Sequence, residues 1–511
     1  MTGRAAVYNR FWHSRGGGER HSGKLAEVLA AGGWQVDLLG HEAFSREDLG
    51  AHLGLDLSRC AVRVLPYRGD ALVEEVSGEY DLFVNASHLS RARARARRNV
   101  YLCYFPTPVD FDWPPWRRTL LRAVAPRVAR GLPWRPGWGP GWFPPEGGPR
   151  RSWAWTSGDA AIPLPHTARR LRLDVARPGG APTTLAVLAD GGTELATLPV
   201  TGTFATHEVD VSAAGARVRL VSDTFSPGPE DRRELGVAVS RLRLDGGGRS
   251  LRSRLALHQP WLLLDATDVS FLDSYDRVVA NSEFTRGWVR RLWGRDADVL
   301  FPPIRVDGLA PETERAPTIV SVGRFFRPGT GHAKRQLEMV TAFGSLHRAG
   351  LLPGWTLHLA GGVEPAHRGY LGEVASAAAG LPVEIHPNAP RALVERLLGS
   401  GSVFWSATGL GESEDAAPWN QEHFGMTTVE AMAAGCVPVV IDRAGQREIV
   451  RDNVDGFRWS TPDEWAERTV RVATDEAMRA RLAASAVERA RDFSEEAFAA
   501  RWREIAAGLG S

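Results

Sequence analysis

Short apolar segments alternate with helix-like stretches at both ends of this 511-residue chain, and no other feature restricts its fold as strongly. In the N-terminal part the candidate strands are AAVY, WQVDLL, DLFVNAS and NVYLCYF, and residues 19–31 carry apolar side chains at helical spacing. Such alternation is typical of parallel βαβ units, whose helices cover both faces of a sheet. The sequence therefore predicts an α/β fold.

The same alternation resumes towards the C-terminus. YDRVVANS precedes a helix expected over 283–293 and the segment DVLFPPI. A second series runs from PTIVSVGRFF through WTLHLAGG, VEIHPN, SVFWSA and VPVVID, and residues 494–509 have the pattern of an amphipathic helix. We expect two α/β units, since the length of the chain favours several domains.

Residues 106–155, between the two series, are rich in Pro, Gly and Trp, which disfavours helices and central strands. Six β-like segments follow at a spacing of about 10–12 residues, an interval typical of sandwiches and barrels. They are RLRLDVA, TLAVLA, ELATLPV, HEVDVS, ARVRLVS and GVAVSRLRL. We expect residues 151–246 to form an inserted all-β, sandwich-like module that follows a linker at 131–150.

The bulk composition excludes some classes of function. The net charge of +2 does not favour a nucleic-acid partner, and no apolar run is long enough to cross a bilayer. The N-terminus lacks the apolar core of a signal peptide. The three cysteines, Cys60, Cys103 and Cys436, are too far apart for a zinc knuckle and fit buried thiols in a reducing compartment. We therefore expect a cytoplasmic protein.

Lys334, in the stretch GHAKRQ, is one of two lysines in a chain that otherwise uses arginine; the other is Lys24. A codon bias towards arginine explains the scarcity but not the position. Lysine differs from arginine where a compact ammonium must meet a phosphate as a point charge. We interpret Lys334 as a candidate phosphate contact and Lys24 as a residue on a solvated helix surface.

The stretch EHFGMTTVEAMAAGCVPVV, residues 422–440, has the pattern of a turn, a helix and a strand. Gly425 would make the turn and Thr427 or Thr428 would cap the helix. A helix N-terminus beside a parallel strand is suited to phosphate, because its amides and dipole attract anions. Glu430 has two open explanations, a capping box with Thr427 or contact with a ligand. Glu422 precedes the turn, where no helix needs it.

The spacing Glu422-x7-Glu430, around HFG and before EAMAAG and PVV, resembles the signature of retaining nucleotide-sugar glycosyltransferases of family 4, which have the GT-B fold. VGRFF with Arg324, followed by Lys334, is similar to the basic pair of that family. GGGER at 16–20 resembles its N-terminal glycine loop, and VANSEFT also matches. The resemblance covers residues 1–110 and 260–510 and leaves out the β-like segments.

The resemblance implies two Rossmann-like domains that face each other across a cleft. The acceptor domain would comprise 1–130 and 251–304, and the nucleotide-sugar domain 305–490, with 491–511 as a helix that packs back on the former. The resemblance implies that Glu430 contacts the donor ribose, Glu422 the transferred sugar, and Arg324 and Lys334 the leaving diphosphate. The groups that would hold sugar and phosphate are Gly425, Met426, Thr427 and Thr428. Gly17 and Gly18 would let the backbone approach the diphosphate closely.

The physics of sugar transfer fits this set without a metal or another cofactor. The sugar passes through an oxocarbenium-like state while negative charge builds on the leaving group. Two cations and a helix N-terminus can stabilise that charge. Arg324 and Lys334 are ten residues apart, so we expect the intervening RPGTGH to bulge.

The acceptor side is less well defined. The family often has a histidine in the first domain, where this chain reads YLCYFPTP with Tyr104. His13 and His88 are the candidate replacements, although a lone histidine is more often structural.

Two further patterns suggest partners. The arginine-rich run Arg91–Arg98 is either a solvated surface or a patch for anionic lipid, which would place the protein at the inner face of a membrane beside a lipid-linked acceptor. Asp110-x-Asp112 and Asp296-x-Asp298 match a metal-binding motif of other glycosyltransferases, but nothing nearby offers further oxygen ligands, so we predict no metal.

The expected function is transfer of a sugar from a nucleotide donor to a glycan or lipid-linked acceptor. SVGRFF followed by QLE resembles mannosyltransferases of the dolichol pathway, which favours mannose. The β module resembles modules joined to other bacterial glycosyltransferases. The alternatives are a GT-B phosphorylase or epimerase, and a catalytically silent glycan-binding protein that acts through the β module.

Overall fold

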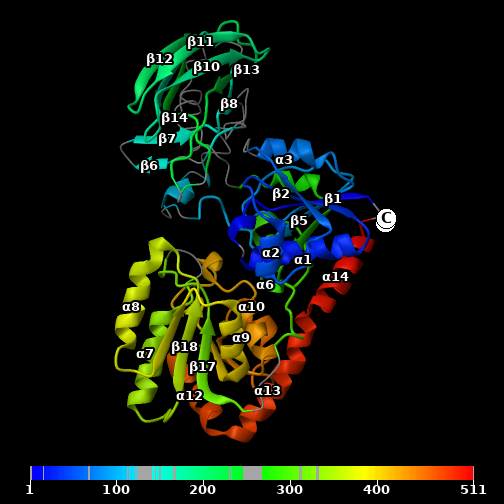
Figure 1. Ribbon diagram of the computed structural model, residues 1–511, viewed down its shortest axis with the longest axis vertical. Coiled ribbons are helices and arrows are strands. Elements are labelled where there is room, and N and C mark those ends of the chain that lie inside the picture. Colours follow the sequence, from blue (N-terminus) through cyan, green and yellow to red (C-terminus); the bar gives the residue numbers. More distant parts are fainter. Residues whose placement is uncertain are drawn as a thin grey trace.

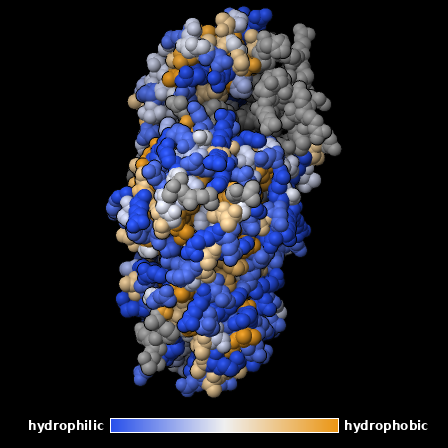
Figure 2. Space-filling view, turned by 90° about the vertical axis from the view of Figure 1, so that its right-hand side faces the viewer, coloured by the Kyte–Doolittle hydropathy of each residue, from blue (hydrophilic) through white to orange (hydrophobic). Residues whose placement is uncertain are grey.

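The computed structural model describes residues 3–14, 16–66, 70–111, 113, 116–120, 122–123, 141–143, 146–148, 151–164, 168–228, 231, 233–245, 267–309, 314–329 and 333–509. Two α/β halves lie one above the other in Figure 1, and a body of antiparallel strands lies at the top of the view. The face shown in Figure 2 is mostly hydrophilic, with apolar side chains in small separate groups. No helix among the described residues is long and apolar enough to cross a membrane.

The first half is built on a parallel sheet with the strand order β16-β15-β5-β4-β1-β2-β3. Its central residues, such as Ala5 and Val7 on β1, are fully buried, because helices cover both faces. The strands are β1 (Arg4–Tyr8), β2 (Gln35–Gly40), β3 (Cys60–Val64), β4 (Leu82–Asn85), β5 (Arg98–Cys103), β15 (Arg277–Ala280) and β16 (Asp298–Val299). The sequence patterns predicted six of them and missed β3, which lies at the sheet edge.

The helices of this half whose bounds are described are α1 (Gly17–Ala31), α2 (Arg46–Leu53), α3 (Asp70–Ser77), α6 (Glu283–Trp293) and α14 (Glu495–Ala507). Helix α6 confirms the helix predicted over 283–293. Ser282 caps its first turn by accepting from Thr285 N, and Gly294 ends it in the left-handed conformation, with φ of 61°.

The second half has a parallel sheet with the order β19-β18-β17-β20-β21-β22. The strands are β17 (Ala316–Val322), β18 (Thr356–Gly361), β19 (Val383–Pro387), β20 (Gly401–Ser406), β21 (Val437–Ile441) and β22 (Phe457–Trp459). The helices are α7 (Gln336–Arg348), α8 (Arg368–Ala378), α9 (Arg391–Ser400), α10 (Met426–Ala433), α11 (Gln446–Ile449), α12 (Pro462–Thr474) and α13 (Glu476–Ala490). Two buried clusters cover the two faces of the sheet.

The antiparallel strands form two sheets, β11-β10-β13-β8 and β12-β9-β14-β7-β6. Leu171 and Leu173 on β9 and Val187 on β10 are fully buried in one cluster, so the apolar faces of the two sheets pack together. The strands are β6 (Glu146–Gly148), β7 (Arg151–Trp155), β8 (Asp159–Pro163), β9 (Arg170–Ala176), β10 (Thr183–Ala189), β11 (Glu194–Val200), β12 (Ala205–Asp210), β13 (Arg217–Val221) and β14 (Ala238–Asp245).

The expectation that residues 106–155 contain neither helix nor central strand is wrong. Strand β7 lies between β14 and β6, and residues 116–120 are helical. The reason is local, because 151–155 read RSWAW, and tryptophan favours strands once proline and glycine are absent. Most of the expected linker at 131–150 lies outside the described residues.

Lys24 corrects another expectation. It is 9% exposed, and its Nζ donates to Glu27 Oε1 and Glu495 Oε2 at 2.6 Å each. Burial lowers the pKa of Lys24, but the two carboxylates outweigh this effect and the net shift is upward. Helix α14 covers this part of α1, which the pattern of α1 alone does not reveal.

Candidate active site

A cleft of about 610 Å³ lies between the two α/β halves. Both halves line it, so segments far apart in the sequence face one space. Of the predicted site residues, the cleft brings together Gly17, Gly18, His88 and Tyr104 from the first half and Arg324, Lys334, Glu422, Gly425, Met426 and Thr427 from the second.

Lys334 and Glu422 form an ion pair in this cleft, with Nζ 2.5 Å from Oε2. Their side chains are 21% and 17% exposed, so the pair is largely shielded from solvent yet reaches the cleft. Thr408 Oγ1 donates to the same carboxylate oxygen at 3.4 Å. A Cβ on Gly323 would lie 2.6 Å from Lys334 Cγ, so the glycine after β17 makes room for the lysine stem.

Arg324 follows β17 and completes the positive side of the cleft. Its Nη1 lies 3.7 Å from Glu364 Oε1, and its guanidinium lies over the ring of Phe326 at 5.8 Å. The guanidinium is half-exposed and has no close carboxylate partner at hydrogen-bond distance among the described residues. Residues 330–332 of the expected bulge lie outside the described residues.

The first turn of α10 opens on the cleft at Met426 and Thr427. The first amides of a helix have no partner within it, so they are available to an anion. Gly425 precedes the helix with φ of 113°, and a Cβ there would lie 2.8 Å from Gln446 Nε2. The turn therefore requires glycine on both backbone and steric grounds.

The predicted cap by Thr427 or Thr428 is wrong. The N-cap residue is Gly425, and no side chain caps the helix. The left-handed glycine starts the helix earlier than the threonines would, and Thr428 is buried within the first turn with its Oγ1 unbonded.

Glu430 does not form the capping box with Thr427. Its Oε1 accepts from Arg391 Nη1 at 2.9 Å, and Arg391 belongs to α9. Glu430 is buried and does not line the cleft. The sequence analysis missed Arg391, because only the packing of α9 against α10 brings the two side chains together.

The glycine loop comes close to the second half. A Cβ on Gly17 would lie 2.8 Å from Met426 Sδ, and one on Gly16 would lie 2.8 Å from Arg324 Nη2. Glu19 holds the loop in place, since its Oε2 accepts from Gly16 N at 2.8 Å and from Ser14 Oγ at 2.5 Å. Glu19 was not singled out from the sequence, although a glutamate three residues into a helix is a capping signal.

The candidate acceptor-side residues differ in position. His88 lines the cleft, whereas His13 lies outside its lining, with Nδ1 3.3 Å from Glu42 Oε2. The Tyr104 hydroxyl donates to Gly18 O at 2.7 Å, and burial raises the pKa of this hydroxyl. Tyr104 therefore braces the glycine loop.

Two histidines that sequence reasoning missed also line the cleft. Burial lowers the pKa of His21 to about 3, and its ring packs against Tyr104. His423 stacks on Phe105 with the ring centres 4.1 Å apart. This stack connects the two halves, and no local sequence pattern predicts it.

Glu448 makes a second contact between the halves. It accepts from the backbone N of Glu283 and Phe284 at the start of α6, at 2.7 Å and 2.6 Å. Burial raises the pKa of Glu448 to about 7, and the two backbone hydrogen bonds oppose this shift.

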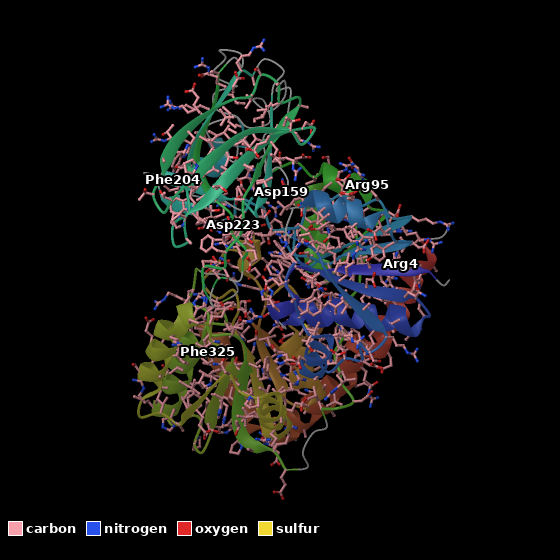
Figure 3. All side chains as sticks on the ribbon, turned by 45° about the horizontal axis from the view of Figure 1, so that its top comes forward. Arg4, Arg95, Asp159, Phe204, Asp223 and Phe325 are labelled. Atoms are coloured by element: carbon pink, nitrogen blue, oxygen red, sulfur yellow. The ribbon has the colours of Figure 1, made fainter. Side chains whose placement is uncertain are left out.

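The arginine-rich run alternates between buried and more exposed residues. Ala92, Ala94 and Ala96 are buried, and the arginines between them point outward from one face. Arg95, labelled beside α3 in Figure 3, pairs with Glu74 at 2.9 Å.

Arginines engage the aspartates of the two metal-like motifs. Asp110 is buried and accepts from Arg122 at 2.8 Å, while Asp112 lies outside the described residues. Hydrogen bonds, first from Arg286, lower the pKa of Asp296 to about 2.

Comparisons with known proteins place the second half in a known class. Residues 310–489 match the family model described as glycosyl transferases group 1. A GDP-Man:Man(3)GlcNAc(2)-PP-Dol alpha-1,2-mannosyltransferase of Dictyostelium discoideum is 31% identical over 207 residues, 37% of this chain and 39% of that protein. A Neurospora crassa protein of the same name is 29% identical over 268 residues, 45% of each chain. The chain thus spans less than half the length of these relatives.

Solved structures show the same fold over nearly the whole chain. Anabaena HepE in complex with UDP-glucose has a TM-score of 0.53 and 13% identity, with 99% of this chain and 100% of that chain covered. Sucrose-phosphate synthase from Thermosynechococcus elongatus has the same TM-score and identity over 99% and 98%. Together, the fold and the group 1 domain support a glycosyltransferase enzyme of GT-B type.

Proposed function

We propose that this protein transfers a sugar from a nucleoside diphosphate donor to a glycan or lipid-linked acceptor. In this proposal the anomeric configuration is retained, as in family 4, and the reaction centre needs no metal ion. Residues 1–130 with 251–304 form the acceptor domain and residues 305–490 the donor domain. We interpret the two antiparallel sheets as an inserted sandwich-like module.

The observation that carries the proposal is the Lys334–Glu422 pair beside the first turn of α10. One ammonium, the Arg324 guanidinium and the helix N-terminus converge on one side of the cleft. Three positive groups on one wall of the cleft suit a diphosphate better than they suit a neutral sugar. Glu422 keeps the ammonium directed towards the cleft.

The same groups supply what the reaction requires. When the bond between the sugar and the diphosphate breaks, negative charge grows on the phosphate oxygen and positive charge on the sugar ring. Lys334 and Arg324 would stabilise the former, and the Glu422 carboxylate would stabilise the latter. Groups held in place before the reaction lower the barrier because they need not reorganise.

The partners are proposed on separate grounds. The relatives named as GDP-Man-dependent mannosyltransferases support mannose as the transferred sugar. The outward arginines of the run 91–98 support contact with an anionic membrane surface, where each contributes about 1 kcal/mol, and so a lipid-linked acceptor.

A thermal-shift screen tests the proposal first. GDP, UDP, ADP and their sugar conjugates are added to the full chain, and we expect GDP-mannose to raise the melting temperature most. A ligand at 100 times its dissociation constant stabilises by about 2.7 kcal/mol. If no nucleotide stabilises the protein and no donor is consumed with any acceptor, the proposal is wrong.

A further inference from the structure

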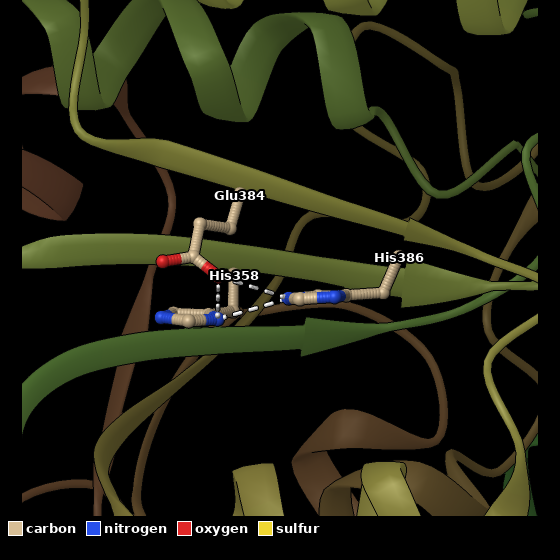
Figure 4. Close-up of side chains that lie close together, drawn as sticks. All are labelled: His358, Glu384 and His386. Atoms are coloured by element: carbon tan, nitrogen blue, oxygen red, sulfur yellow. Dashed lines mark hydrogen bonds and ion pairs between the residues drawn. The ribbon is translucent and has the colours of Figure 1, made fainter.

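Three side chains on the outer strands of the second sheet lie close together, His358 on β18 and Glu384 and His386 on β19 (Figure 4). His358 Nδ1 is 3.0 Å from His386 Nε2, and Glu384 Oε2 is 3.7 Å from each nitrogen. The parallel register pairs His358 with Glu384, and His386 lies two residues further along β19. All three side chains therefore project from the same face of the sheet.

The spacing of the three atoms fits a metal ion. A point equidistant from them lies about 2.0 Å from each, which agrees with the ~2.0–2.2 Å of zinc bonds to nitrogen and carboxylate oxygen. Two imidazoles and one carboxylate suit Zn²⁺ and similar first-row ions, whereas Mg²⁺ and Ca²⁺ prefer oxygen. The Glu384 side chain is 61% exposed, so an ion can enter from solvent.

The surroundings of His358 favour the required tautomer. Its Nε2 lies 3.3 Å from Thr356 Oγ1, which in turn lies 3.2 Å from Thr318 Oγ1. If Nε2 carries the proton and donates to Thr356, Nδ1 presents its lone pair to the other two ligand atoms. Histidines bound to metals are commonly oriented in this way through their second ring nitrogen.

We propose that His358, Glu384 and His386 bind one divalent first-row transition-metal ion, with Zn²⁺ as the form to test and water as a further ligand. The ion ties β19 to β18. The ends of the two strands are also joined by the backbone, since Asn388 N donates to Gly361 O at 2.8 Å. None of the three ligands lines the cleft, so the ion is structural and the proposal is independent of the sugar-transfer function.

Calorimetric titration of Zn²⁺ into the chelator-treated, tag-free full chain tests the site. We expect one ion per chain, and His386→Ala and Glu384→Gln should each weaken binding at least about 100-fold. Thr356→Val should weaken it about 10- to 100-fold, the range for a group behind the ligands. His52→Gln, which removes an exposed imidazole from α2, is the matched control and should bind as the wild type does.

Circular dichroism without metal shows whether each variant folds, and melting curves show whether the metal stabilises it. Glu384→Gln changes an exposed side chain, so it keeps the test valid if His386→Ala fails to fold. Zn²⁺ should raise the melting temperature of the wild type and of Lys334→Arg, but not of Glu384→Gln, and Mg²⁺ should raise none. A wild type without saturable binding at one ion per chain, or a Glu384→Gln variant that binds normally, overturns the proposal.

Discussion

The two walls of the cleft differ in chemical character although both follow the ends of parallel strands. The second half presents an ammonium, a guanidinium, a carboxylate and a helix N-terminus. The described lining from the first half contains no lysine or arginine: it presents the glycine backbone at the start of α1, the Glu19 carboxylate, a tyrosine whose hydroxyl is already bonded, and other rings. Similar sheets thus provide different functions: one wall can stabilise charge, whereas the other provides space and shape.

The largest expected effect comes from the charged wall. Lys334→Arg and Glu422→Gln should each lower kcat/KM for sugar transfer at least about 100-fold, the scale for loss of one preorganised charged contact. Initial rates with the best donor from the screen measure this.

Lys24→Arg is the control for the lysine variant, because it changes the only other lysine, which belongs to α1 and donates to Glu495 of α14. It should transfer sugar at the wild-type rate. Near-normal rates in both cleft variants would contradict the contrast between the two walls.

The next effect should come from the shape of the glycine wall. Gly17→Ala should lower kcat/KM about 10-fold, because its new methyl group would meet Met426 and hold the halves apart, and small displacements of reacting groups are costly. Gly18→Ala should cost at most about 3-fold, since its Cβ would sit 3.6 Å from the Tyr104 ring in ordinary contact. Met426→Ala should partly restore Gly17→Ala. Equal losses in both glycine variants would show that shape is not the cause.

A smaller effect, on the KM for the donor, is expected from the Arg391–Glu430 ion pair behind the charged wall. Arg391→Gln leaves the buried Glu430 without its partner. An ion pair with one half-exposed partner contributes about 1 kcal/mol. We therefore expect the KM for the donor to rise about 5-fold. Arg396→Gln on the same helix changes an exposed side chain and serves as the control. An unchanged donor KM in Arg391→Gln would show that this pair does not position Glu430 for the donor.

The smallest effect concerns the joint between the halves. The pKa of Glu448 is raised to about 7, so the folded state holds this proton more tightly than the unfolded state. The associated stability is present below the ordinary pKa of a glutamate and is lost as pH rises through 7. Relative to Glu448→Gln, the wild type should therefore lose about 2–4 °C in melting temperature between pH 5 and pH 8.

Glu283→Gln at the same joint is a useful comparison, because the Glu283 side chain is 56% exposed. The Glu283 charge adds to the upward pKa shift of Glu448, after burial, so this variant should reduce the pH dependence of melting only in part. A flat difference between the wild type and Glu448→Gln would mean that the carboxylate is not held between the halves in solution.

Sequence reasoning succeeded where structure is decided locally. The capping serine and the terminating glycine of helix α6 can be recognised in the sequence, and RLRLDVA shows the apolar–polar alternation of β9. It failed where partners come from distant segments. Lys24 is covered by α14, and Glu430 is bound by α9. The cluster at His358 exists only because of the register between β18 and β19.

The last helix closes the core of the first half, since Phe498, Trp502 and Ile505 share a buried cluster with β1 and β4. During synthesis on a ribosome, the apolar face of the first sheet therefore stays uncovered until α14 has been made. A nascent chain of this protein exposes that face until α14 has been made, and a truncation near residue 495 would leave the face exposed and prone to aggregation.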